Sequence, residues 1–250
     1  MSRTIRVVGM GMGPDHLTPE ATRALAASSY VVAARKHRGS DERDPLLAVR
    51  AAVAAGAGLA VVEVPDPPRG RTPADYRGEV ADWHAARAEA WGAAISARDG
   101  DPALLVWGDP SLYDSTIRVV DAVAARLGAR VEVVAGVAAP QLLAARHGVV
   151  LHAVGEPVLL TTGRRLARDL AAGTPNVVVM LDGDLACLDP GLGLQEWTIR
   201  WGANLGTPSE RLVAGRVREV ADDLRAARAA ARETAGWVLD TYLLRAPAPF

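Results

Sequence analysis

Three closely spaced glycines near the start of the chain are the first residues whose type and spacing could serve a ligand. Gly9, Gly11 and Gly13 follow a β-branched run in the segment VVGMGMGPDHLT, residues 7–18. Glycine lets the backbone turn sharply and approach a ligand or a neighbouring helix closely. The segment therefore predicts a tight strand-to-helix turn, which either contacts a ligand or serves packing alone.

The same turn departs from the pattern of a dinucleotide site. A nicotinamide-binding fold would carry a glycine where Pro14 stands, and an acidic residue at the end of the second strand, where Arg35 and Lys36 stand. Arg35 could instead bind a 2′-phosphate, so an NADP-linked oxidoreductase stays open as an alternative of a different class.

A second loop, WGDPSLYDST at residues 107–116, is predicted to follow a buried strand. In an open α/β sheet, ligands bind at the carboxyl ends of the strands. Gly108 would allow close backbone approach, and the Asp109 carboxylate would suit a ribose diol or a cation. On the simpler interpretation, Asp109 or Asp114 caps a helix and Tyr113 is a packing residue.

Two further segments could take part in binding. The small residues of AGVAAPQ, residues 135–141, permit close approach either to a ligand or to the sheet. The segment GEPVLLTTGRR, residues 155–165, places Arg164 and Arg165 at a predicted helix start. Their guanidinium groups could bind carboxylates in a fork, or could simply be solvated.

Composition narrows the class of protein. Half of the 250 residues are hydrophobic and the formal net charge is −1, which gives no global field for nucleic acid or an anionic membrane. Cys187 is the only cysteine, so an internal disulfide is excluded and a reducing compartment is favoured. The histidines lack metal-ligand spacing, and no Walker loop, nucleophile elbow, signal segment or spanning segment is found. We therefore expect a cytoplasmic protein that binds no metal, nucleic acid or membrane.

The elements that must position these loops can be read from hydrophobic periodicity. In the first 150 residues five β-branched runs read as buried strands, at Ile5–Gly9, Tyr30–Ala34, Leu59–Val64, Ala103–Trp107 and Arg130–Val134. Helix starts between them are marked by Thr18-Pro19, Asp44-Pro45 and Thr72-Pro73. Such alternation is typical of a mostly parallel, five-stranded sheet with helices on both faces.

Beyond residue 150 the pattern loosens. Strand-like runs occupy 157–162, 176–181, 197–204, 211–217 and 237–245, with a short helix near Gly163 and a longer one at Glu219–Arg232. This succession predicts a mixed sheet with antiparallel pairs. Glycine and proline at 148–157 interrupt the periodicity, so the chain is predicted to form two α/β domains, residues 1–150 and 151–250.

Taken in order, the loops resemble those of the tetrapyrrole (cobalamin-type) methyltransferases. The turn GMGMGPDHLT, the loop GDPSLY, the turn AGVAA, the strand VVVML and the late GTPSE together cover nearly the whole chain. The resemblance implies a two-domain α/β fold with S-adenosylmethionine in the cleft between the domains and S-adenosylhomocysteine as the product. It also implies a homodimer and no metal.

The resemblance assigns cofactor contacts residue by residue. They fall on Met12, Trp107, Gly108, Asp109, Leu112, Ala138, Ala139, Met180 and Gly206. Two features depart from the family pattern. The opening loop is one residue shorter than the usual Gly-Asp-Pro-Asp form, and Ala138 replaces the usual threonine of the third motif. Because backbone groups carry much of the contact, we expect cofactor binding to survive.

Within the family, the segments WGDPSLYDSTIR, GEPVLLTTGRRL, WGANLGTP and GWVLDTYLLR resemble the members that methylate precorrin-5 at carbon 1 and release acetate, giving precorrin-6A. Release of acetate needs a water activated against a carbonyl. The candidates for this catalytic role are Asp109, Tyr113 and Asp114, together with Asp15 and His16.

The tetrapyrrole substrate carries many carboxylates, so cations at its binding site are expected to be substrate contacts. The candidates are Arg35, Lys36, Arg164 and Arg165. A sister precorrin C-methyltransferase acting on another ring carbon stays open, because the shared motifs concern the cofactor. A non-catalytic tetrapyrrole-binding protein is the other alternative, motivated by the hydroxyl missing at Ala138.

Overall fold

The structure is a computed structural model that describes residues 2–35, 45–68 and 76–247. The chain divides into two compact units, Met1–Ala138 and Ala139–Phe250. Each unit has its own sheet and core, and each is described separately below.

The first unit contains a five-stranded parallel sheet in the order β3-β2-β4-β1-β5. Its strands are β1 (Thr4–Gly9), β2 (Tyr30–Arg35), β3 (Val61–Pro65), β4 (Pro102–Val106) and β5 (Arg130–Val134). All five strands predicted from the sequence are therefore confirmed, with ends that differ by two residues at most. Because every strand runs in the same direction, the loops that follow β1, β4 and β5 lie at one edge of the sheet.

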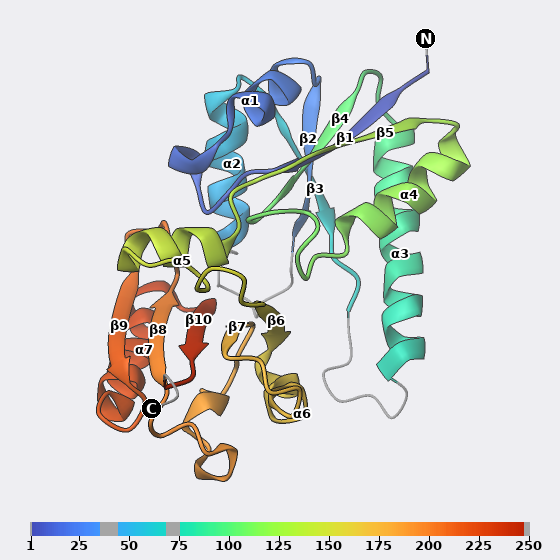
Figure 1. Cartoon of the computed structure of the whole chain (residues 1–250). Helices are drawn as coiled ribbons and strands as arrows, with labels where there is room; N and C mark the ends of the chain where they lie inside the picture. Colours follow the sequence, from blue (N-terminus) through green and yellow to red (C-terminus); the bar gives the residue numbers. More distant parts are fainter. Residues whose placement is uncertain (1, 36–44, 69–75, 248–250) are drawn as a thin grey trace. The chain divides into compact units, whose positions relative to one another are not determined.

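Helices cover both faces of this sheet, as predicted (Figure 1). They are α1 (Pro19–Ala26), α2 (Pro45–Gly56), α3 (Tyr76–Ser96) and α4 (Thr116–Leu127). Alternate residues of each strand serve opposite faces. In β1, Ile5 and Val7 pack towards α3 and α4, whereas Val8 packs towards α1 and α2.

Local sequence explains where these helices begin and end. Thr18 caps α1, since its side chain accepts a hydrogen bond from the backbone N–H of Ala21. Gly128 closes α4 in the left-handed conformation that glycine adopts without strain. The predicted helix-start residues Asp44, Thr72 and Pro73 lie outside the described residues.

The second unit contains a five-stranded mixed sheet in the order β6-β7-β10-β8-β9. Its strands are β6 (Leu159–Thr162), β7 (Asn176–Met180), β8 (Thr198–Ala203), β9 (Arg211–Arg216) and β10 (Asp240–Arg245). β6 and β7 are parallel, and the other three pairs are antiparallel. The predicted mixed sheet is confirmed.

One face of the second sheet carries most of the unit's core. Trp201 and Tyr242 are fully buried there against α6 (Leu166–Leu170) and α7 (Ala221–Ala235). The opposite face is partly covered by α5 (Ala139–His147), which packs against β8 and β10. Short 3-10 turns complete the described elements, namely η1 (Pro14–His16), η2 (Gly163–Arg165), η3 (Ala186–Leu188) and η4 (Pro190–Leu192).

The division between the units falls earlier in the chain than the predicted domain boundary at residue 150. The reason is α5, whose buried Leu142 and Leu143 lie on a helix that packs on the second sheet. Periodicity alone assigns such a helix to the sheet that precedes it. Within the described ranges, no helix is long and apolar enough to cross a membrane.

Candidate functional site: the loops after the strands

In the first unit, the loops that follow β1 and β4 are joined by their backbones. Gly108 donates a hydrogen bond from its N–H to the carbonyl of Gly11 at 2.8 Å, and Gly11 donates one to the carbonyl of Gly108 at 3.2 Å. Both glycines have positive φ, 63° for Gly11 and 72° for Gly108. Glycine is the residue that adopts this conformation without strain.

The loop after β5 packs against the same two loops, and their backbones lie too close together to leave room for side chains. A Cβ atom placed on Gly136 would lie 2.2 Å from the carbonyl oxygen of Gly108, and one on Gly9 would lie 2.6 Å from the Gly136 nitrogen. Real Cβ atoms do not approach backbone so closely, so the loops meet here only because glycine stands at positions 9 and 136, whereas position 108 needs glycine for its positive φ. The glycines noted in the sequence therefore have a packing role, whatever they bind.

Asp109 ties these loops together through hydrogen bonds. One carboxylate oxygen accepts from the N–H of Ser111 at 2.8 Å and from its hydroxyl, and the other accepts from the N–H of Gly136 at 2.9 Å. Burial by itself would raise the pKa of Asp109, but the three hydrogen bonds together hold that pKa below its ordinary value. Asp109 is therefore an ionised loop-holding group and a weak base.

The rest of the GDPSLY loop presents Tyr113. Its φ of 51° is unusual for a residue other than glycine, and its side chain is 46% exposed. The neighbouring Asp114 accepts a hydrogen bond from the N–H of Thr116 at 2.6 Å, at the start of α4. The N-cap position itself is occupied by Ser115, so Asp114 lies one residue before the cap and its side chain serves the first N–H group of the helix.

Several residues predicted to contact the cofactor are brought together in the first unit. A Cβ placed on Gly108 would meet the Met12 sulfur at 3.7 Å and the Cα of Ala138 at 3.6 Å. Met12 and Ala138 are buried, whereas Trp107 and Leu112, in the same loop as Gly108, are partly exposed. Ala139 is the first residue of α5 in the second unit.

Among the described residues of the first unit, the other predicted catalytic and substrate-binding residues belong to η1 and to the end of β2. His16 and Asp15 belong to η1, and the Nδ1 atom of His16 is buried with no hydrogen-bond partner among the described residues. Arg35, at the end of β2, is exposed and pairs with Glu63 at 3.7 Å. Lys36 lies outside the described residues. Within the described part of the chain, no cluster of three or more His, Cys, Asp or Glu side chains could hold a metal.

In the second unit, Met180 ends β7 and is followed by a turn that is held by a buried carboxylate. Asp182 accepts hydrogen bonds from the Tyr242 hydroxyl at 2.6 Å and from the N–H of Ala186 at 2.7 Å. Next to this pair, Asp240 bonds to Arg228 at 3.2 Å. Burial raises the pKa of Asp240 to about 6, although Arg228 opposes the shift.

Gly206 lies in a loop that Asn204 organises. Asn204 is fully buried with a φ of 49°. Its side chain donates to Ser209 at 3.1 Å and to the carbonyl of Trp237 at 3.2 Å, and accepts from the N–H of Leu239 at 2.9 Å. The sequence analysis did not select Asn204, although asparagine between a strand and a glycine is a known signal for a left-handed residue.

Glu210, the last residue of the GTPSE motif, completes this loop, a role that the sequence analysis did not predict. It accepts a hydrogen bond from the N–H of Gly206 at 2.7 Å and forms an ion pair with Arg146 of α5 at 3.0 Å. The N–H of Gly206 is therefore already used within the protein. The glutamate of the GTPSE segment therefore has a structural role: it holds the Gly206 loop and links this loop to α5.

The paired arginines of η2 are both exposed. Arg165 forms a two-pronged ion pair with Asp169, one turn further along the chain, at 2.9 and 3.0 Å. Hydrogen bonds from Arg165 and from Thr161 hold the pKa of Asp169 below its ordinary value. A substrate carboxylate would have to compete with Asp169 for the fork of Arg165.

The fold and these loops agree with a match to a known family. Residues 4–221 match the family model described as tetrapyrrole (corrin/porphyrin) methylases, and the chain belongs to this family. A precorrin-6A synthase (deacetylating) from Sinorhizobium sp. is 40% identical over 261 residues, covering 99% of this chain and 97% of the relative.

Two solved structures are also similar to this chain. A cobalamin synthesis related protein (CobF) from Corynebacterium diphtheriae is 37% identical, with a TM-score of 0.82 and coverage of 98% of this chain and 99% of that one. The uroporphyrin-III C-methyltransferase of Thermus thermophilus, complexed with S-adenosylhomocysteine, is 24% identical, with a TM-score of 0.59 and coverage of 97% and 92%. The second likeness shows a shared fold.

Proposed function

We propose that the chain is an S-adenosylmethionine-dependent C-methyltransferase of cobalamin biosynthesis, which methylates carbon 1 of precorrin-5 and releases acetate to give precorrin-6A. The observation that carries this proposal is the 40% identity to a precorrin-6A synthase (deacetylating) across 99% of the chain. Family membership makes the NADP-linked oxidoreductase the weaker alternative, because the matched family consists of methylases.

The first unit fits a cofactor at the carboxyl ends of its strands. A Cβ on Gly108 would lie in ordinary van der Waals contact with the Met12 sulfur at 3.7 Å and the Cα of Ala138 at 3.6 Å, so the missing side chain leaves backbone between these two residues that a ligand can approach. Met12, Gly108 and Ala138 would hold the cofactor there, and Met180 and Gly206 remain the predicted contacts of the second unit. When bound, S-adenosylmethionine supplies an electrophilic methyl group. The chain's own task is to align the reactants, which contributes several kcal/mol to catalysis.

Asp109 takes part in this alignment and does not act as the base. Its two oxygens accept three hydrogen bonds, and its lowered pKa makes it a poor proton acceptor. Holding Gly136 to the GDPSLY loop fixes two of the three loop ends relative to each other. The departure at Ala138 leaves this backbone arrangement intact, because Asp109 bonds to a main-chain N–H.

Tyr113 is the candidate that best suits the hydrolytic half of the reaction. Its side chain is exposed in the loop after β4, where a substrate can reach it, and its positive φ marks a constrained backbone of the kind that is common at functional sites. Such a hydroxyl can orient the water that attacks the acetyl carbonyl. The Asp114 carboxylate is engaged by the N–H of Thr116 at the start of α4.

Turnover of precorrin-5 tests the proposed function. The purified chain, given S-adenosylmethionine under anaerobic conditions, should form one equivalent each of S-adenosylhomocysteine and acetate. S-adenosylhomocysteine without acetate would instead indicate a sister methyltransferase acting on another carbon. Neither product, with intact cofactor binding, would favour the non-catalytic tetrapyrrole-binding protein.

The Tyr113→Phe variant separates the two halves of the reaction. We expect acetate release to slow by about 100-fold while methyl transfer stays within a few fold of the wild type, since the hydroxyl acts only on the water. The amount of S-adenosylhomocysteine formed in the same sample is the internal control. Equal slowing of both products would remove Tyr113 from the hydrolytic role.

We further propose that the protein acts as a cytoplasmic homodimer, which the family resemblance supports. Light scattering after size exclusion should give twice the chain mass of 26.2 kDa. A mass equal to one chain at micromolar concentration would contradict the dimer.

A further inference from the structure

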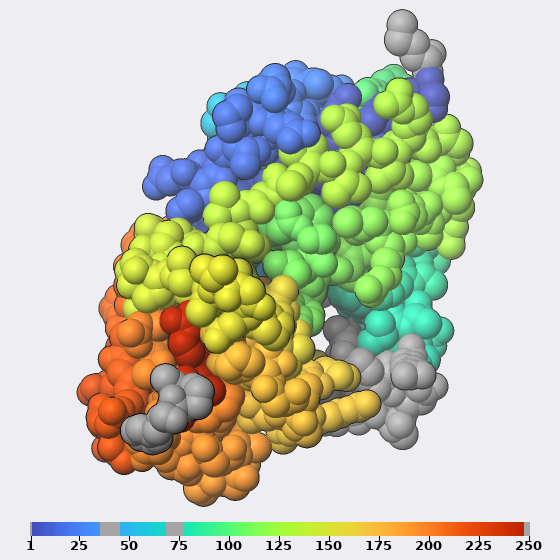
Figure 2. Space-filling model, in the orientation of Figure 1, coloured from blue at the N-terminus to red at the C-terminus, as the bar shows by residue number. Residues whose placement is uncertain are grey.

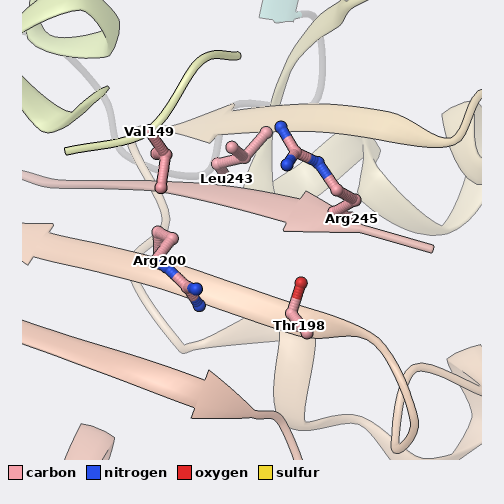
Figure 3. A pocket seen from close by; sticks show the side chains of 5 residues that line it. All are labelled: Val149, Thr198, Arg200, Leu243 and Arg245. Carbon is pink, nitrogen blue, oxygen red and sulfur yellow. The ribbon is translucent and has the colours of Figure 1, made fainter. Parts of the chain in front are cut away.

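A shallow hollow opens on the face of the second sheet that α6 and α7 do not cover. It is small and open to solvent, and it is lined by Val149, Thr198, Arg200, Leu243 and Arg245 (Figure 3). In Figure 2, red atoms of the β10 region are seen at the surface beside the yellow segment that follows α5. Leu243 and Arg245 lie in the segment GWVLDTYLLR, but none of the five residues is among the predicted cofactor, substrate or catalytic residues.

The register of β8 and β10 places the two arginines on one face. Arg245 lies opposite Thr198, and Leu243 lies opposite Arg200. Alternate residues of a strand point to the same side, so Thr198, Arg200, Leu243 and Arg245 all project from the same face. Arg200 and Arg245 are diagonal neighbours, a relation that separates Cα atoms by roughly 7–8 Å and leaves long side chains within reach of one another.

Arg245 is held in place by uncharged partners. Its Nε donates to the Asn176 side chain at 3.0 Å, and one terminal nitrogen donates to the carbonyl of Val150 at 2.7 Å. Arg200 makes a single hydrogen bond, to the carbonyl of Ile199 at 3.2 Å. Neither guanidinium forms an ion pair with a carboxylate of the described residues, and both keep donors for a ligand.

Two carboxylates of the second unit, those of Glu156 and Glu210, are engaged by other partners. Glu156 accepts from Asn176, which is the main cause of its lowered pKa, and the charge of Arg245 adds to the effect. Glu210 is bound by Arg146 and Gly206. Burial and then the nearby Arg200 charge lower the pKa of His147, so this ring is neutral at pH 7.

We infer that Arg200 and Arg245, with the Thr198 hydroxyl, bind a carboxylate carried on a short hydrocarbon arm. A carboxylate matches the forked donors of arginine and relieves the repulsion between two unpaired guanidinium groups. The buried Leu243 and the partly buried Val149 provide the apolar contact that methylene groups need. The carboxylate arms of a tetrapyrrole have this chemistry, a source that rests on the proposed function, and so do free dicarboxylates.

Titration with two stable probes tests the site in the full-length protein. Uroporphyrin carries eight carboxylate arms on a tetrapyrrole, and glutarate is a free dicarboxylate. Arg200→Ala is the variant of choice, since Arg200, unlike Arg245, supports no neighbouring segment. The matched control is Arg216→Ala, which removes a charge from the same face of the same sheet, where Arg216 lies opposite Thr198 and pairs with Glu219 at 3.6 Å.

We expect Arg200→Ala to weaken binding of at least one probe about tenfold at physiological ionic strength, and Arg216→Ala to weaken it less than twofold. Loss confined to uroporphyrin assigns the site to the tetrapyrrole, and loss that includes glutarate assigns it to free carboxylates. Equal losses in both variants, or no binding of either probe to the wild type, would overturn the inference. The affinity for S-adenosylhomocysteine should be the same in all three proteins, so a failure of the proposed function is recognised separately.

Discussion

The two units hold their loops by different physical means. In the first unit, three loop ends meet mainly through backbone, because Gly9 and Gly136 leave no Cβ atoms between them, and one partly exposed carboxylate, that of Asp109, adds hydrogen bonds. In the second unit, buried polar side chains hold the loops: Asn204 bonds to segments near residues 209, 237 and 239, and Asp182 bonds to Tyr242.

Because of this difference, the two units should respond differently to substitutions and to changes of pH. Contacts between backbones are sensitive to added volume and insensitive to pH. Buried polar contacts are sensitive to the loss of a single donor or acceptor, and their ionisable members make stability depend on pH. Substitutions of similar size in the two units should therefore differ in their effects on stability, on ligand affinity and on the pH dependence of stability.

The largest effect is expected in the second unit, from Asn204→Ala. The change removes three hydrogen bonds, leaves the N–H of the partly buried Leu239 without its side-chain partner, and places alanine at a φ of 49°. We expect the free energy of unfolding to fall by about 4 kcal/mol, measured by urea titration.

Asn204→Gly separates the two causes. Glycine adopts the left-handed conformation freely, so the glycine variant should lose less unfolding free energy than the alanine variant, by about 1–2 kcal/mol. Equal costs for the two variants would show that backbone conformation plays no part at this position.

In the first unit, Gly136→Ala tests sensitivity to volume. The added Cβ would lie 2.2 Å from the Gly108 carbonyl oxygen, so the loops must separate. We expect a loss of stability of about 3 kcal/mol, together with a fall in S-adenosylhomocysteine affinity of about 100-fold. Gly56→Ala, at the end of α2, is the control, because its Cβ would meet nothing within 4 Å. Similar behaviour of the two variants would refute the role given to the backbone contacts.

The ionisation of Asp240 in the second unit should make the free energy of unfolding depend on pH. Its pKa is raised to about 6 by burial, so the folded state holds a proton that the unfolded state has released. The free energy of unfolding should therefore fall by roughly 2–3 kcal/mol as the pH rises from about 4 to about 7. Asp240→Asn should lack this part of the pH dependence, and an unchanged pH profile in the variant would contradict the assignment.

The smallest effect is expected from Asp109→Asn in the first unit. The amide keeps one acceptor oxygen, so we expect S-adenosylhomocysteine affinity to fall by about 1 kcal/mol in a calorimetric titration. Because the pKa of Asp109 is lowered in the folded state, its ionised carboxylate also stabilises the fold, and this stabilisation should be lost as the pH falls below about 4. Asp121→Asn, an exposed change on α4, should leave the affinity unaltered; a loss equal to that of Asp109→Asn would point to a general charge effect.

Much of the fold could be predicted from the sequence, because short buried strands alternate with amphipathic helices in the first unit. The glycine loops of the first unit were also predictable, since local spacing such as that of Gly9 and Gly11 reflects a local requirement of the backbone. The unit boundary was not, because a helix such as α5 carries no local mark of the sheet on which it packs.

The polar contacts of the second unit escaped prediction for a related reason. Asn204 bonds to Leu239, 35 residues away, and Asp182 bonds to Tyr242, 60 residues away. No spacing rule connects residues so distant in sequence. The arginines of the open sheet face, Arg200 and Arg245, likewise come together only through strand register.

The measurement that tests the account most directly is a calorimetric titration of the wild-type protein with S-adenosylhomocysteine, with NADP as the comparator. The demethylated cofactor is stable, and its binding does not depend on a supply of precorrin-5. We expect one site per chain with micromolar affinity for S-adenosylhomocysteine, and no heat from NADP. Binding of NADP, or no binding of S-adenosylhomocysteine at millimolar concentration, would contradict the claim that the loops of the first unit form a methyltransferase cofactor site.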